Sequence, residues 1–179
     1  MSEPSLGVDH PVRRLVIDLP QNYDAARVEY ERLVPVVDGA AFAAARSWDE
    51  QIQIAKSAAP LGFMRYARMD VGEYMAGSTS QWKATQYLMG NHTIAETMYR
   101  HDPAVMLHAP LRTLIYVSPE GHTRIAVDQP SLLFESYHDP RIAEVGLHLD
   151  ALLAGVITAL GAEVPRELVG ARRSSSTSG

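Results

Sequence analysis

The sequence predicts an α+β fold, with a small mixed or antiparallel sheet and helices packed mainly on one of its faces. The chain has 179 residues, 46% of them hydrophobic, which is enough for a single core. A strand–turn–strand pattern covers residues 112–127, and the turn Ser118-Pro119-Glu120-Gly121 has the proline and glycine positions of a type I turn. A long amphipathic pattern, residues 140–160, predicts a helix that covers the sheet.

The elements before the hairpin follow from local patterns. The β-branched centre of residues 13–19 predicts a strand, and apolar spacings of three and four after Asn22 predict a helix over 22–34. An alanine-rich helical turn is expected over 39–45, and Ser47 with Glu50 forms a capping-box pattern for a helix over 48–58. Strands are then expected over 63–69 and 81–89, and Gly90-Asn91 precedes a helix over 92–100.

After a loop over 101–110, the strands of the hairpin are expected over 112–117 and 123–127. A short helix from Ser131 follows, and Asp139-Pro140 begins the longest helix, which Gly161 ends. We expect an irregular arm over 1–11, a single α+β domain over 12–168 and a disordered Ser-rich tail over 169–179.

Composition argues against several classes of function. The net charge of −5 gives no basic surface for nucleic acid, and the absence of cysteine excludes disulfides and thiolate metal sites. The first twenty residues contain Glu3, Asp9, Arg13 and Arg14 and no long apolar run, so we expect neither a signal peptide nor a membrane partner, and a cytoplasmic location.

Five separate segments keep a recognisable order. They are Met69-Asp70-Val71, then Leu88-Met89-Gly90-Asn91-His92, then Ala109-Pro110-Leu111 followed by Leu114-Ile115-Tyr116, and lastly Val127-Asp128-Gln129-Pro130. Over roughly residues 60–137 this order resembles the bacterial family called domain of unknown function 302. Two motifs depart from the family pattern, since Val71 replaces its histidine and His92 its proline. The resemblance implies a small α+β fold, dimerisation and no established reaction.

Histidines are the natural ligands for a metal or haem in a chain without cysteine. His108 lies in an apolar segment, where it needs either a backbone partner or a ligand, and His148 lies between two leucines and is expected to be partly buried. No pair of histidines has the i, i+4 spacing of a helical zinc site and no HExxH motif occurs, which argues against a hydrolytic zinc centre. Methionines such as Met89 and Met106 fit either a core or an apolar haem pocket.

These observations leave three classes of function open. The first is a small-molecule binding or sensing protein that acts as a homodimer, with its pocket between the sheet and the helix over 140–160. The second is an enzyme with a histidine-ligated haem or metal, whose candidate residues are Asp70, Arg112 and Tyr116 for catalysis, His108, Met106 and Met89 for a cofactor, and His108 and His148 for a metal. The third is a structural or interaction subunit. The sequence leaves the cofactor unknown, with haem as the leading candidate.

Overall fold

A computed structural model of the chain describes residues 7–169, so most of the predicted tail and the start of the predicted arm lie outside the described residues. Its centre is a five-stranded antiparallel sheet with strand order β1-β5-β4-β3-β2. The strands are β1 (Arg14–Asp18), β2 (Met64–Asp70), β3 (Ala84–Gly90), β4 (Leu111–Val117) and β5 (Thr123–Asp128). The predicted α+β class is therefore confirmed, and the sheet is antiparallel throughout.

Helices occupy the positions that the sequence patterns indicated, with small shifts at their ends. They are α1 (Tyr23–Leu33), α2 (Gly39–Ala44), α3 (Trp48–Ala58), α4 (Val71–Tyr74), α5 (His92–Tyr99), α6 (Pro130–Glu135) and α7 (Pro140–Ala159), with 3-10 turns η1 (Pro103–Leu107) and η2 (Arg166–Leu168). The side chains of Asn22, Ser47 and Asp139 cap α1, α3 and α7, each accepting a hydrogen bond from a backbone amide of the first turn. The short helix α4 and the turn η1 lie where the sequence suggested only loops.

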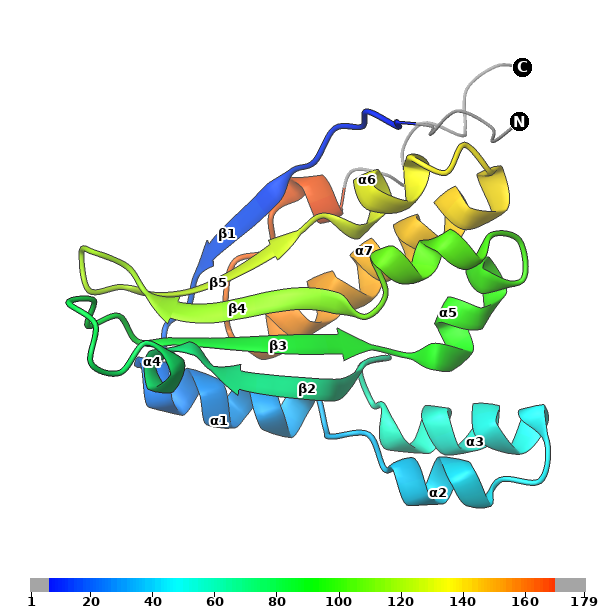
Figure 1. Cartoon of the computed structure of the whole chain (residues 1–179), viewed down its shortest axis with the longest axis horizontal. Coiled ribbons are helices and arrows are strands. Elements are labelled where there is room, and N and C mark those ends of the chain that lie inside the picture. The colour runs from blue at the N-terminus through cyan, green and yellow to red at the C-terminus, as the bar shows by residue number, and fades with distance from the viewer. Residues whose placement is uncertain (1–6, 170–179) are drawn as a thin grey trace, which may run out of the picture.

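One face of the sheet is covered by α1 and α7. In β4 and β5 burial alternates with the pleat, so that Leu111, Thr113 and Ile115 face the same core as Thr123, Ile125 and Val127. Two buried hydroxyl pairs join α1 to this face, since Tyr23 Oη lies 2.6 Å from Thr85 Oγ1 and Tyr30 Oη lies 2.9 Å from Thr113 Oγ1. Figure 1 shows α7 running behind the strands.

The strand expected over 81–89 begins at Ala84, so Trp82 precedes it and is 57% exposed. Within β3 the residues that face the helices are Thr85, Tyr87 and Met89, whereas Ala84, Gln86 and Leu88 face the opposite side. The covered face of β3 therefore carries the buried side chains, two of which, Thr85 and Tyr87, also make hydrogen bonds.

A hairpin of two helices, α2 and α3, lies beside the main core near the start of β2 (Figure 1). Phe42, Ala55, Ala59 and Met64 form a separate small cluster there, with Tyr66 packed against it. This hairpin brings aromatic side chains of the first third of the chain to the end of the sheet where β3 passes into α5.

The helix α7 is, by length and composition, apolar enough to cross a membrane, with a mean hydropathy of 1.6 over its best window. A core helix of a globular domain passes the same test. In this fold Ile142, Leu149, Leu153, Val156 and Ile157 are buried against the sheet and α6. Packing on the covered face of the sheet therefore accounts for the apolar character of α7.

Candidate functional site

An apolar pocket lies where the sheet passes into α5. Its volume is about 200 Å³, and its walls come from the start of β2, the end of β3, α5, and the segment that leads into β4. The apolar walls include Phe63, Ile94, Met98, Met106, Pro110, Leu111, Phe134 and Leu149. The pocket touches α7 only at Leu149, so it lies at the end of the sheet rather than along the whole predicted helix.

Three polar side chains, those of Tyr66, Asn91 and His92, line this apolar pocket. The Tyr66 hydroxyl lies 2.7 Å from His92 Nδ1 and accepts the backbone N–H of His92 at 3.0 Å. The direction of the bond between the hydroxyl and Nδ1 follows the tautomer of the neutral ring. With the ring hydrogen on Nε2, Tyr66 donates to Nδ1 and His92 offers a hydrogen-bond donor at Nε2.

The surroundings of His92 keep its ring neutral. Burial lowers the pKa of His92 below its ordinary value, because the charged ring loses hydration in an apolar setting. The ring packs edge-on against Phe42, with 4.4 Å between centroids, and lies 6.3 Å from the ring of Trp48. Burial likewise raises the pKa of the Tyr66 hydroxyl, so the pair is uncharged near neutral pH.

The start of α5 holds this pair in position. Asn91 is the N-cap of α5, and its side-chain oxygen accepts the Thr93 amide at 3.0 Å. Its side-chain nitrogen donates to the Gly62 carbonyl at 3.1 Å, which ties the helix to the loop before β2. His92 is the first residue of α5, so its position follows directly from this cap.

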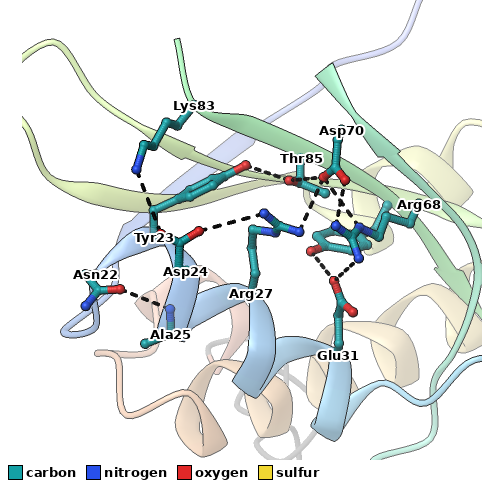
Figure 2. A network of polar contacts seen from close by, with 11 residues as sticks. Asn22, Tyr23, Asp24, Ala25, Arg27, Glu31, Arg68, Asp70, Lys83 and Thr85 are labelled. Carbon is teal, nitrogen blue, oxygen red and sulfur yellow. Dashed lines mark hydrogen bonds and ion pairs between the residues drawn. The ribbon is translucent and has the colours of Figure 1, made fainter. Parts of the chain in front are cut away.

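A second group of polar side chains joins α1 to the edge of the sheet. Figure 2 shows Arg27 reaching from α1 toward Asp70 of β2, with Arg68 and Thr85 on the other sides of the carboxylate. Asp70 accepts from Thr85 Oγ1 at 2.8 Å and from Arg68 at 2.6 Å. Glu31 completes the network by accepting from the hydroxyl of Tyr87 at 2.9 Å and pairing with Arg68 at 3.4 Å.

This network suits a structural role for Asp70 rather than a catalytic one. Burial alone would raise the pKa of Asp70, but hydrogen bonds from Arg68 and Thr85, with the charges of Arg27 and Arg68, hold it below its ordinary value. A carboxylate whose pKa is low accepts a proton poorly at neutral pH. The ion pairs instead join α1 to β2, which is an edge strand of the sheet.

The three predicted catalytic residues do not meet. Asp70 faces the covered side of the sheet, where it pairs with Arg27, whereas Arg112 and Tyr116 lie on the opposite side in β4. Arg112 and Tyr116 share the wall of a surface hollow of about 420 Å³ that also includes Arg14 and Asp128. Sequence position alone does not reveal which face of a strand a residue occupies when both faces carry polar groups.

The predicted cofactor and metal residues are also separated. Met89 is fully buried in the core, Met106 is 44% exposed and lines the apolar pocket, and His108 lies outside the walls of that pocket. His108 packs against the rings of His10 and Phe134, and burial together with the nearby His10 lowers its pKa.

The expectation that His148 is partly buried is wrong, because it is exposed on α7 while the adjacent Leu149 faces the core. Within residues 7–169, no group of three or more His, Asp or Glu side chains is arranged to hold a metal ion.

The pair that the sequence did not identify as a site is Tyr66 with His92. The two residues are 26 positions apart and meet only because β2 and β3 are neighbours, with β3 leading directly into α5. The sequence did contain one indication of this site, because Gly90-Asn91-His92 belongs to one of the motifs that resemble the DUF302 family. Ala109-Pro110-Leu111, another of those motifs, forms part of the same pocket wall.

Comparison with known proteins agrees with this architecture. A crystal structure of an uncharacterised conserved DUF302 protein from Bacillus stearothermophilus has the same fold, with a TM-score of 0.61 and 15% identity over 82% of this chain and 97% of that one. No curated protein matches the chain. The family model for domain of unknown function DUF302 matches residues 44–160, which is more than half of the chain. The protein is therefore a member of the DUF302 family.

Proposed function

We propose that this DUF302 protein is a cytoplasmic, homodimeric small-molecule binding or sensing protein, whose ligand occupies the pocket beside Tyr66 and His92. The observation that carries the proposal is an apolar cavity of about 200 Å³ with a neutral, hydrogen-bonded Tyr–His pair in its wall. A mainly apolar pocket with a few convergent polar groups is the usual form of a small-molecule site.

The volume limits the size of the ligand. An apolar protein cavity of about 150 Å³ accommodates benzene. A pocket of about 200 Å³ therefore suits a ligand with one ring or a short branched chain and a small substituent. It is too small for a porphyrin with its four pyrrole rings, and His108 is not among its lining residues. The pocket thus gives no support to the haem alternative.

The polar pair favours a ligand with one hydrogen-bonding group. His92 offers a donor at Nε2, and because the ring is neutral it attracts an uncharged hydroxyl or carbonyl without the cost of burying an ion. A hydrogen bond of this kind contributes about 0.5–1.5 kcal/mol, which corresponds to roughly a two- to tenfold difference in affinity. We expect phenol-like molecules to bind better than hydrocarbons of the same size.

The test compares phenol with toluene, which differ only by a hydroxyl in place of a methyl group. Binding is followed by chemical-shift changes of the pocket methionine methyl groups and by the shift in melting temperature. We expect both molecules to bind, phenol more tightly, and the preference for phenol to disappear in His92→Phe, which removes the proposed donor. Absence of binding by both probes at millimolar concentration would contradict the proposal.

A matched pair of variants locates the binding. Ala95 lies in the pocket wall on α5, so Ala95→Phe should fill the cavity and abolish binding. Ala151 is exposed on α7, and Ala151→Phe adds the same side chain away from the pocket. Phenol binding that survives Ala95→Phe but not Ala151→Phe would place the ligand elsewhere.

A further inference from the structure

The side of the sheet opposite α1 and α7, which we call the open face, carries α4 and residues 75–83 at one end, where they line a hollow with Ala84, Leu114 and Tyr116. Over the rest of this face no helix packs along the strands within residues 7–169. Its fourteen outward residues lie in three rows that run across the strands. The first row is Arg14, Asp128, Arg112, Leu88 and Ala67; the middle row is Val16, Ala126, Leu114, Gln86 and Met69; the third row is Asp18, Arg124, Tyr116 and Ala84.

The middle row is mostly apolar and partly exposed. Val16 is 49% exposed and Met69 is 38% exposed, although both are large apolar side chains of edge strands. Two surface hollows, of about 390 and 420 Å³, meet on this face, since Leu114 and Tyr116 line both of them. Partly apolar, hollowed faces of this kind are typical of surfaces that another protein covers.

From this pattern we infer that the open face binds the open face of a second copy of the chain, around a two-fold axis that runs along the middle row. The inference rests on the homodimer in the proposed function and adds the surface and the axis. The axis lies midway between the two facing sheets and runs perpendicular to their strands. Rotation about it places each strand over its own equivalent, and the first row of each copy over the third row of the other. The middle row of each copy then faces itself.

Charge complementarity is the reason for this choice. In the facing rows Arg14 of one copy lies opposite Asp18 of the second copy, and Asp128 lies opposite Arg124. Each pairing occurs twice because of the symmetry, so both basic residues of the two strands β1 and β5 meet acidic ones.

The remaining positions are also compatible with this axis. Arg112 of one copy comes to lie over the ring of Tyr116 of the second, which is a favourable cation–π arrangement. Leu88 faces Ala84, and Leu114 meets its own equivalent at the centre of the sheet. Apolar residues therefore meet apolar residues along the centre of the interface.

The other simple axis is unfavourable. A two-fold axis along the central strand β4 would place Arg112 against its own equivalent in the second copy, and like charges in direct opposition are repulsive. It would also place Arg14 and Asp128, which pair with each other at 3.8 Å within one chain, opposite the uncharged Ala67 and Leu88, so neither would gain a charged partner across the interface. The axis across the strands leaves the strands of the two sheets nearly aligned, as in common sheet packings.

The size of the face indicates a weak dimer. Five strands spaced by about 4.8 Å and rows that span about 14 Å along each strand give a patch of roughly 19 by 14 Å. This is below the usual contact of about 800 Å² per partner. We therefore expect dissociation at micromolar concentration and weaker association at high salt, because exposed ion pairs are screened.

The first experiment measures the oligomeric state by sedimentation velocity over a range of protein concentrations. Leu114→Glu puts two carboxylates against each other at the axis and should raise the dissociation constant at least tenfold. Leu147→Glu makes the same change on the exposed surface of α7, where Leu147 is 43% exposed, and should leave it unchanged. Circular dichroism and the melting temperature confirm that both variants fold.

The second experiment tests the axis. The chain has no cysteine, so Val16→Cys carries a single thiol that faces its own equivalent across the proposed axis. A short bismaleimide should link this variant as a dimer, and the link should be lost when Leu114→Glu is added. Val28→Cys, 71% exposed on α1, is the control and should not be linked.

The outcomes separate the two proposals. A chain that remains monomeric at every concentration contradicts both the homodimer and the open-face inference. A dimer whose dissociation constant is unaffected by Leu114→Glu overturns the open-face inference and leaves the homodimer. A dimer that depends on Leu114 but is not linked by the bismaleimide in Val16→Cys overturns the proposed axis.

Discussion

The two interior glycines of α7 provide a direct test of the packing between α6 and α7. A Cβ atom added at Gly155 would meet no heavy atom within 4 Å. A Cβ atom added at Gly146 would lie 3.0 Å from Ser131 Cα and 3.1 Å from Phe134 Cβ, so it would press on the backbone of α6. The same substitution, Gly→Ala, therefore has opposite structural consequences at two positions of one helix.

The magnitudes follow from two contributions. Replacing a helix-interior glycine by alanine stabilises the helix by about 0.5–1 kcal/mol, because the unfolded chain loses conformational freedom. This contribution is shared by both variants. Overpacking against a rigid neighbour costs about 1–3 kcal/mol, and it applies only at Gly146. We expect Gly155→Ala to be more stable than the wild type, and Gly146→Ala to be less stable than Gly155→Ala by about 1–3 kcal/mol.

Urea unfolding followed by circular dichroism measures both free energies under one set of conditions. Phe134 lines the ligand pocket, so displacement of α6 in Gly146→Ala should also weaken phenol binding, whereas Gly155→Ala should not. Equal stability of the two variants would refute the close approach of α6 and α7 at Gly146. A denaturation slope that differs between the variants would show that more than local packing had changed.

Three further predictions concern hydrogen-bonded and ion-paired side chains. Asp150 is buried and accepts two hydrogen bonds, at 2.8 and 2.9 Å, so Asp150→Ala should cost about 1–3 kcal/mol of unfolding free energy, because the Ser131 amide loses its acceptor and the Gln129 side chain loses one of three; a loss below that of a typical surface substitution would contradict this. Tyr30→Phe and Thr113→Val should each destabilise by about 1–2 kcal/mol, and the double variant by clearly less than their sum, whereas strictly additive losses would argue against the buried hydroxyl pair. Because the pKa of Asp70 is lowered in the folded state, its stabilising effect is present above the ordinary pKa of about 3.9 and is lost as pH falls through the lower folded value. Urea midpoints should therefore fall less steeply below pH 4 in Asp70→Asn than in the wild type, and parallel curves would contradict the role of the ion pairs with Arg68.

Local signals were sufficient for most of the secondary structure. The caps at Asn22, Ser47 and Asp139 and the turn that ends at Gly121 were predicted, because a cap or a turn depends on residues within four positions of each other. The Gly121 amide donates to the Ser118 carbonyl at 2.9 Å, as expected for this turn. The short helix α4 was not predicted, since its four residues are too few to show a helical period.

The candidate site was less accessible to the same reasoning. Met106 was named and does line the pocket, but His108 lies outside its walls and His148 is exposed. Apolar neighbours in sequence suggested burial for both histidines. On a helix, however, adjacent residues point about 100° apart, so the leucine after His148 faces the core while the histidine faces outward.

By itself, the sequence determined the fold class, the positions of the longer helices and the hairpin, and the resemblance to the family, because each depends on short-range pattern or on motif order. Only the tertiary structure decided that Tyr66 meets His92, that Asp70 is separated from Arg112 and Tyr116 by the sheet, and that one face of the sheet is open. The physical reason is that strand pairing joins residues far apart in the chain, and a one-residue change in register would exchange the two faces of a strand. The register of the strands depends on the packing of the whole core, and a short stretch of sequence does not contain that information.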